Sequence, residues 1–414
     1  MNDSQNSAVA TPTDPRNVVP REVKGTVEQP SKSSGGGGKL SAWRDLAMFI
    51  ALGALFIFFT YETPYFASPR NLSMLSIELS ITAVLALGML LIIVTGNIDL
   101  SAGSGVGLIG GIASVLVFNR DWSAPGALGV GLLIAVVVWS AMGALIVYQR
   151  IPAFIITLGG LLMYKGLFWL VIGSQTIPVV QGGGENLYSM LTTYYLPTSV
   201  GVTLGVVLVA GAAVLSVLGA RARARYGLPA VPARRVYGKL VGLAAFVAAA
   251  IFVATKFRGV PLPLAILTVV ALVVHFVTTS TPFGRYLYAI GGNEDASRLS
   301  GVPVERVVVG AFGIMGVLVA ITGFMQTAYA GASTTTVGDL MELDAVAACV
   351  IGGTSLKGGR GTVLGVIMGA LIMATLINGM TLMAVSPEMK YIVRGGVLAG
   401  AVWLDVALSR RGGR

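Results

Sequence analysis

The sequence is poor in charge, cysteine and histidine. Only 11% of its 414 residues are Asp, Glu, Lys or Arg, whereas a soluble domain has about 25%. The single cysteine, Cys349, excludes a disulfide framework within the chain. The single histidine, His275, lies in an apolar run, and neither a Cys/His metal spacing nor a Gly-x-Ser-x-Gly element occurs. We therefore expect no catalytic residues, no metal site and no cofactor in this chain.

Apolar residues are abundant and make up 55% of the chain. Apolar runs near the roughly 20 residues that span a bilayer recur along the sequence. They predict an all-α polytopic membrane protein with about 10–12 transmembrane segments in the lipid bilayer. The runs are Leu46–Thr60, Leu72–Thr95, Gly103–Phe118, Ala127–Tyr148, Ile151–Gly173, Ser199–Gly219, Leu240–Thr255, Pro261–Thr279, Val307–Tyr329, Thr362–Met383 and Tyr391–Leu408.

The two ends of the chain and its loops carry most of the charge. Residues 1–40 are rich in Pro, Ser, Thr and Gly, which predicts a disordered tail ahead of a transmembrane domain over 41–414. The net charge of +10 is concentrated in short loops and tails, such as Arg221–Arg235 and the C-terminal arginines. This pattern indicates membrane topology rather than nucleic-acid binding, and it predicts that both termini are cytoplasmic.

Two glycine-rich stretches interrupt the apolar runs and match one another. Gly96–Ala113 and Gly352–Gly369 each follow one hydrophobic run and start another. Side by side, Gly96 falls on Gly352, Leu100 on Leu356, Gly103 on Gly359 and Gly105 on Gly361. Irregular backbone is tolerated at membrane depth only where it is buried in protein or lines a water-filled cavity. We interpret the pair as pseudo-repeated broken-helix elements beside a translocation pathway.

Polar residues within these two elements are candidates for the pathway. They could present hydrogen-bonding groups to a hydroxylated solute or gate its path. Asp99 or Ser101 could instead cap the following helix by accepting its unpaired N–H groups, and Ser355 could do the same in the second copy. The candidates are Asn97, Asp99, Ser101 and Ser104 in the first element, and Thr354 and Ser355 in the second.

Four further polar side chains lie inside predicted spans. Glu78 and Lys165 are ionisable, so they are expected to face a cavity, to pair with one another, or to reach the membrane interface. Gln326 and Asn378 are uncharged and could likewise face the pathway, and Asn378 could instead form a hydrogen bond across helices.

The polar loop Thr281–Arg306 has the signals of two short helices. Gly291 and Gly292 form a turn, Asn293 is a predicted N-cap, and Gly301 and Pro303 end the second helix. A loop with this density of turn and cap residues suits docking by a partner protein better than a plain connection.

The combination of these motifs resembles the membrane permeases of ATP-binding-cassette sugar importers, in the ribose/xylose/arabinose branch. The matching segments cover most of the chain from Leu46 to Asp405, and the extra pair of spans before residue 257 is most similar to the xylose permeases. The matching motifs are 97–101 (Asn-Ile-Asp-Leu-Ser), 283–285 (Phe-Gly-Arg), 289–293 (Ala-Ile-Gly-Gly-Asn), 299–301 (Leu-Ser-Gly), 342–345 (Glu-Leu-Asp-Ala) and 350–356 (Val-Ile-Gly-Gly-Thr-Ser-Leu).

The resemblance implies a permease subunit in a bacterial inner membrane that translocates D-xylose. It implies a second permease copy, an extracytoplasmic sugar-binding protein, and a cytoplasmic ATPase that uses the ATP. The alternatives are a self-sufficient proton-coupled sugar transporter, or the same importer class carrying another pentose or a nucleoside. The loop 281–306 would be the ATPase-coupling element, through Arg285, Gly291, Gly292, Asn293, Glu294, Asp295, Ala296, Arg298 and Gly301.

Overall fold

A computed structural model describes residues 37–227 and 232–412. The described residues form fifteen helices and four two-residue strands. Residues 1–36 of the predicted tail lie outside this part, and residues 37–40 already belong to the first helix. The helices are α1 (Gly37–Glu62), α2 (Pro69–Val94), α3 (Ala102–Phe118), α4 (Ala124–Gln149), α5 (Ala153–Ile172), α6 (Leu187–Thr193), α7 (Thr198–Arg225), α8 (Ala233–Thr255), α9 (Leu262–Ser280), α10 (Pro282–Gly292), α11 (Glu294–Leu299), α12 (Val304–Ala330), α13 (Met341–Ile351), α14 (Val363–Leu382) and α15 (Pro387–Gly412).

The prediction of an all-α polytopic membrane protein is confirmed. Within the described residues, eight helices are long and apolar enough to cross a membrane: α2, α4, α5, α7, α8, α9, α12 and α14. Leu46–Glu62 of α1 and the whole of α3 are shorter apolar helices. Helix α13 has 11 residues, which is too short to cross a bilayer by itself.

Helix α2 forms the centre of the bundle. Its C-terminal half is apolar on all sides, so this half has no face suited to water, and every residue from Ala83 to Val94 is buried. Helices α9, α12, α13 and α14 pack around it. The core of the protein therefore surrounds the helix that leads into the first glycine element.

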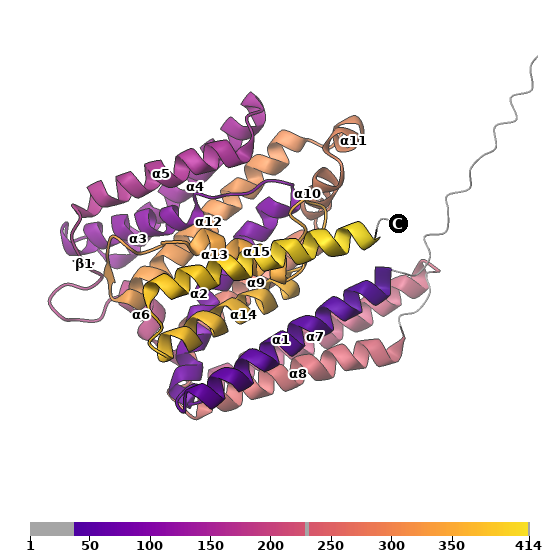
Figure 1. Cartoon of the computed structure of the whole chain (residues 1–414), viewed down its shortest axis with the longest axis horizontal. Coiled ribbons are helices and arrows are strands. Elements are labelled where there is room, and N and C mark those ends of the chain that lie inside the picture. The colour runs from indigo at the N-terminus through magenta and orange to yellow at the C-terminus, as the bar shows by residue number, and fades with distance from the viewer. Residues whose placement is uncertain (1–36, 228–231, 413–414) are drawn as a thin grey trace, which may run out of the picture.

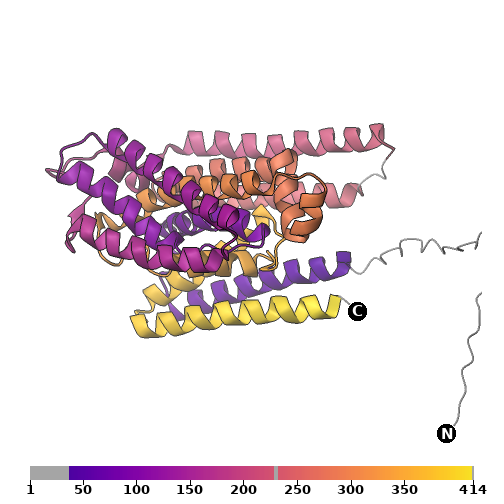
Figure 2. The ribbon, with the colours of Figure 1, turned by 90° about the horizontal axis from the view of Figure 1, so that it is seen from above.

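Two pairs of short strands join distant parts of the chain. Strand β1 (Ile177–Pro178) pairs antiparallel with β4 (Ala332–Ser333), and β2 (Tyr195–Leu196) pairs with β3 (Val260–Pro261). The second pair closes the base of the α7–α8 hairpin. Figure 2 shows this hairpin on one side of the bundle, while α1 and α15 are both on the opposite side.

The ends of the helices separate into two groups (Figure 1). The start of α1, the short helices α10 and α11, and the end of α15 lie at one end of the bundle. Strand β1 and helix α6 lie at the other end. The predicted docking loop is thus at the same end as both described termini.

Candidate functional site

The two predicted helix breaks are present and lie against one another. The chain leaves α2 at Val94 and enters α3 at Ala102, and it leaves α13 at Ile351 and enters α14 at Val363. Gly96, Gly358 and Gly359 have φ of 85°, 87° and 71°, a conformation that favours glycine. The N–H of Gly359 donates to the carbonyl of Val94 at 2.9 Å. The pseudo-repeat therefore brings its two copies into direct backbone contact.

Asp99 is fully buried in the first break. Its carboxylate accepts hydrogen bonds from the Ser101 N–H at 2.8 Å, the Ser101 hydroxyl at 2.6 Å and the Trp139 indole N–H at 2.7 Å. These bonds satisfy a buried carboxylate that would otherwise be very costly. The bond from Trp139 also holds the start of α3 against α4, the helix that contains Trp139. Asp99 therefore orders the break, and it lines neither of the two cavities described below.

The other polar residues of the two breaks have different surroundings. Asn97 donates from its side-chain amide to the Thr95 hydroxyl at 2.9 Å. Thr354 is fully buried, and the Ser355 hydroxyl accepts from the Lys357 N–H at 3.3 Å. The prediction that Ser355 caps the next helix is wrong, because the loop continues past it and Thr362 accepts from the Gly365 N–H at 3.1 Å.

A cavity of about 470 Å³ that is open to the outside of the bundle, here called the central cavity, is lined by residues of α3, α5, α13 and α15. Pockets of roughly 300–1,000 Å³ hold small organic ligands. Of the polar residues predicted in the two helix breaks, Ser104 alone lines this cavity. The lining residues are Ser104, Leu161, Lys165, Gly338, Asp339, Leu340, Glu342 and Tyr391.

Lys165 on the cavity wall forms an ion pair with Asp339. Its ammonium group also donates to the carbonyl of Thr335 at 2.9 Å. The prediction that Lys165 could pair with Glu78 is therefore wrong. The true partner lies on the segment between β4 and α13, which folds back into the bundle, and sequence spacing gives no signal for such a long-range contact.

Glu78 belongs to a separate polar network. Its carboxylate accepts from the Tyr329 hydroxyl at 2.8 Å and from the Asn378 side chain at 3.1 Å. Asn378 in turn accepts from the side chain of Asn71 at 2.9 Å. The network connects α2, α12 and α14, which agrees with the interpretation of Asn378 as an interhelical bond. Gln326 is half-buried on α12.

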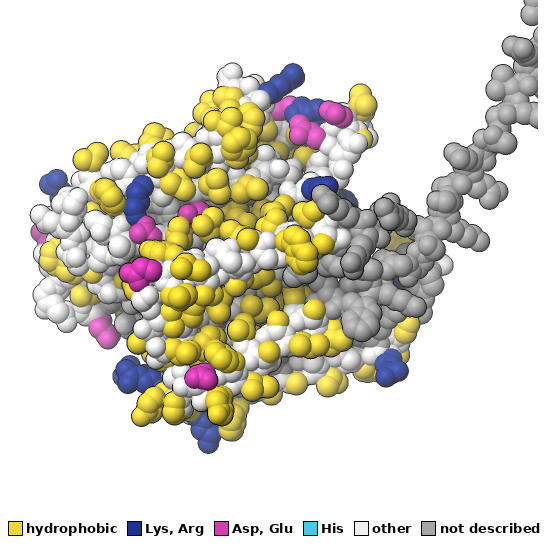
Figure 3. All heavy atoms as spheres, in the orientation of Figure 1, with side chains coloured by type: hydrophobic (Ala, Val, Ile, Leu, Met, Phe, Trp, Pro, Cys, Tyr) yellow, Lys and Arg dark blue, Asp and Glu magenta, His cyan; other side chains and the backbone are white. Residues whose placement is uncertain are grey.

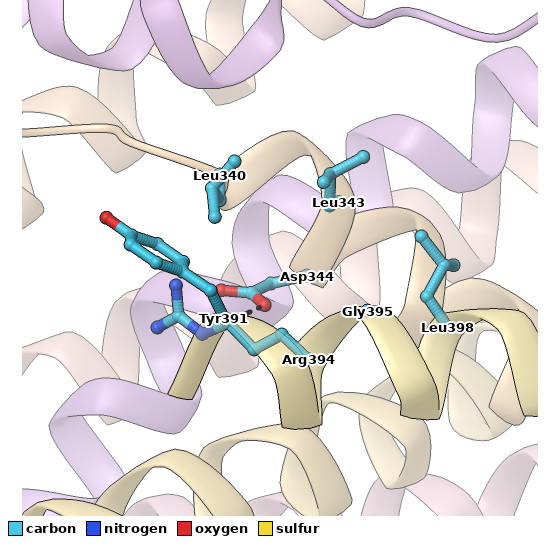
Figure 4. A pocket seen from close by; sticks show the side chains of 7 residues that line it. All are labelled: Leu340, Leu343, Asp344, Tyr391, Arg394, Gly395 and Leu398. Carbon is cyan, nitrogen blue, oxygen red and sulfur yellow. Dashed lines mark ion pairs between the residues drawn. The ribbon is translucent and has the colours of Figure 1, made fainter. Parts of the chain in front are cut away.

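A smaller cavity of about 70 Å³, here called the side cavity, lies between α13 and α15 (Figure 4). Asp344 and Arg394 line it, 3.7 Å apart, and Tyr391 and Leu340 line both cavities. Sequence reasoning missed these residues as a site. Asp344 was part of a matching motif, but the isolated Arg394 in the last apolar run gave no signal of a partner.

The loop forms the two predicted short helices, but the predicted turn at Gly291 and Gly292 is wrong, because both residues belong to the end of α10 and the helix breaks at Asn293. The side chain of Asn293 accepts from the Ala296 N–H at 2.9 Å, which caps α11. Arg298 forms an ion pair with Glu294 at 2.9 Å and a second one with Glu305. The hydrogen bond to Glu305, followed by that to Glu294, raises the pKa of Arg298. The side chain of Leu299 is 91% exposed. Arg285, Gly292, Asp295 and Gly301 are exposed as well.

The loop contacts both helix breaks through backbone groups. A Cβ added to Gly291 would collide with the carbonyl of Val94 and lie 2.5 Å from the N of Gly359. A Cβ added to Gly358 would lie 2.8 Å from the Cα of Gly291 and 3.0 Å from the N of Gly96. We call Gly96, Gly291, Gly358 and Gly359 the glycine junction. Beside it, the Tyr288 hydroxyl donates to the carbonyl of Gly361 at 2.9 Å.

Comparison with known proteins gives the family. Residues 71–402 match the family described as the permease component of the branched-chain amino acid transport system. The chain belongs to this permease family. It is 38% identical over 393 residues to the xylose transport system permease protein of Escherichia coli, covering 95% of this chain and 98% of the relative.

Two other relatives of this permease extend the comparison. The xylose transport system permease protein of Haemophilus influenzae is 38% identical over 371 residues, covering 88% of this chain and 96% of the relative. The ribose import permease protein of Escherichia coli is 30% identical over 356 residues, covering 86% and 92%. No solved structure matches the chain.

Proposed function

We propose that this protein is the membrane-spanning permease subunit of an ATP-driven sugar importer and that its cargo is D-xylose. The observation that carries this proposal is the 38% identity to a xylose permease over 95% of the chain, including the α7–α8 hairpin. The central cavity supports it, because its volume and its few polar groups suit a small hydroxylated solute.

The cytoplasmic partner is an ATP-binding-cassette ATPase that docks on α10 and α11. This loop projects from the end of the bundle that carries both described termini (Figure 1), and Leu299 at its tip is almost fully exposed. Exposed apolar side chains on an ordered loop suit a protein interface. ATP is bound and hydrolysed by the partner. The opposite end, near β1 and α6, receives the sugar-binding protein.

A second copy of the permease covers the central cavity. The Lys165 and Asp339 side chains are 22% and 36% exposed on the side of the bundle, and Figure 3 shows acidic and basic side chains among apolar ones near the start of α15. Charged groups facing lipid hydrocarbon are costly. A homodimer removes them from lipid and encloses the pathway between two copies.

The location that fits this assembly is the bacterial inner membrane, with both termini in the cytoplasm. The arginines of α7, α8 and the C-terminal end, together with Arg298, then face the cytoplasm as the positive-inside rule requires.

In the transport cycle, the central cavity would open alternately toward each side. Ser104, Lys165 and Glu342 would meet the sugar, while Asn97, Asp99, Ser101, Thr354 and Ser355 would hold the two breaks between which the pathway opens. Closure of the ATPase would move α10, and the glycine junction would pass this movement to both breaks. Glu78, Tyr329 and Asn378 would hold α2, α12 and α14 in register during the change.

Reconstitution into proteoliposomes tests the proposal. D-Xylose uptake is measured with the ATPase and the binding protein present together, singly, or omitted. We expect uptake only when both partners and ATP are present. Uptake by the permease alone under a proton gradient would overturn the importer assignment, and ATP-dependent uptake of another pentose or a nucleoside in place of xylose would overturn the cargo.

A further inference from the structure

The side cavity contains an ion pair whose partners do not touch. The Nε of Arg394 and the Oδ1 of Asp344 are 3.7 Å apart, beyond hydrogen-bond distance. Both atoms are buried, and neither has a hydrogen-bond partner within the described part of the chain. The Asp344 side chain is 8% exposed. Buried polar groups are almost always hydrogen-bonded, so this pair requires an explanation.

The side cavity beside the two groups is large enough for a hydroxyl group. The side cavity has a volume of about 70 Å³, and a single water needs only about 10–15 Å³ measured in this way. Figure 4 shows Asp344 from α13 and Arg394 from α15 pointing toward one another, with Tyr391 beside them. The remaining walls are Leu340, Leu343, Gly395 and Leu398. A ligand bound here would meet one carboxylate, one guanidinium and a largely apolar surface.

The side cavity adjoins the central cavity, since Tyr391 and Leu340 line both. A solute in the central cavity can therefore extend past Tyr391 toward Asp344. The charges lining the two cavities favour a neutral solute over an acidic one. The two cavities are lined by three acidic and two basic residues. The acidic residues are Asp339, Glu342 and Asp344, and the basic residues are Lys165 and Arg394.

We propose that Asp344 and Arg394 form a hydroxyl-binding subsite for a neutral monosaccharide on the pathway. One sugar hydroxyl donates to the Asp344 carboxylate while its oxygen, or that of a neighbouring hydroxyl, accepts from the guanidinium of Arg394, whose side chain is 21% exposed. The sugar thereby supplies the bridge between the two groups. This inference rests on the proposed function, and it assigns a role to the Asp344 position within the Glu-Leu-Asp-Ala motif.

A labelling experiment on the purified permease tests the subsite without ATP or partner proteins. The native Cys349 is fully buried, so a thiol reagent reports on an introduced cysteine. Gly395 lines the side cavity and its neighbour Gly396 does not, and a Cβ at either position meets nothing within 4 Å. The Gly395→Cys variant is the probe, and the Gly396→Cys variant is its matched control.

We expect D-xylose to slow labelling of the Gly395→Cys variant and to leave the Gly396→Cys variant unchanged. At about twice the dissociation constant the labelling rate falls about threefold, because it follows the unoccupied fraction. D-Xylonate, which carries a negative charge, should protect far less. Adding Asp344→Asn, or Arg394→Lys as a milder second variant, should abolish the protection by D-xylose while labelling without sugar continues.

The proposal is overturned if D-xylose protects neither variant, if it protects both equally, or if protection persists with Asp344→Asn and Arg394→Lys. Equal protection by sucrose would indicate an effect of viscosity and would also overturn it. Because the assay needs no ATP, protection without ATP-driven uptake would reject the importer function and leave the subsite standing. ATP-driven uptake without protection would reject the subsite and leave the importer function standing.

Discussion

Replacing Gly291 by alanine should uncouple ATP hydrolysis from sugar transport. Gly291 is the penultimate residue of α10 and lies directly on the backbone of both helix breaks, at Val94 and Gly359. The added methyl group would lie 2.5 Å from the Gly359 nitrogen, where ordinary contacts are about 3.5–4 Å. The loop must therefore move away from the breaks by about 1 Å or more.

The size of the effect follows from overpacking at this contact. Extra methyl groups in close-packed sites cost about 1–3 kcal/mol. The displacement also threatens the hydrogen bond from Gly359 to Val94, 2.9 Å long in the native chain. If this free energy weakens the contact between the loop and the breaks, the coupling between ATPase movement and the breaks falls by about 5-fold to 150-fold. We expect the amount of D-xylose transported per ATP hydrolysed to fall within this range.

The neighbouring residue provides the control. A Cβ on Gly292 meets nothing within 4 Å, and the residue lies in the same helix. The assay measures ATP hydrolysis and D-xylose uptake in the same proteoliposomes for Gly291→Ala and Gly292→Ala. ATPase binding and hydrolysis should persist in both, with uptake lost only in the first. Equal uptake per ATP in the two variants would refute the role of the glycine junction.

Three further substitutions test other parts of the account. The Asp99→Asn variant leaves the Ser101 N–H or the Trp139 indole N–H without an acceptor, so the free energy of unfolding should fall by about 1–3 kcal/mol. The measurement is the unfolding temperature in detergent, and an unchanged temperature would contradict the ordering role of Asp99. The Lys165→Asp variant should lose uptake, and the double variant Lys165→Asp with Asp339→Lys should recover a large part of it, with a coupling energy of about 1 kcal/mol. No recovery would contradict a role for the attraction between the two charges. Leu299→Ala should weaken ATPase binding about tenfold without lowering the unfolding temperature of the permease, since Leu299 is 91% exposed and burying such a side chain is worth about 1.5–3 kcal/mol; unchanged binding would place the docking surface elsewhere.

Local signals predicted much of the fold. The length and apolarity of the runs located the eight helices of the described residues that are long enough to cross a membrane, because a bilayer sets the length of a crossing helix. Turn and cap residues located the two helices of the loop, since Asn293 offers an acceptor to the N–H of Ala296. The glycine repeat predicted the two helix breaks correctly, because only glycine readily adopts the positive φ of Gly96 and Gly358.

The partners of the ionisable residues could not be predicted in this way. Lys165 and Asp339 are 174 positions apart, and their meeting depends on how the segment before α13 folds back into the bundle. Asp344 and Arg394 likewise meet only when α15 packs on α13. Such contacts depend on tertiary packing, about which hydrophobic periodicity gives no information.

The sidedness of ATP tests the central claim most directly. Vesicles are prepared with the ATPase bound to the α10–α11 loop and the binding protein at the opposite end, and ATP is supplied on one side only. The account predicts D-xylose accumulation on the loop side when ATP is present there, and none when ATP is restricted to the other side. Accumulation that is independent of ATP and follows a proton gradient would contradict it.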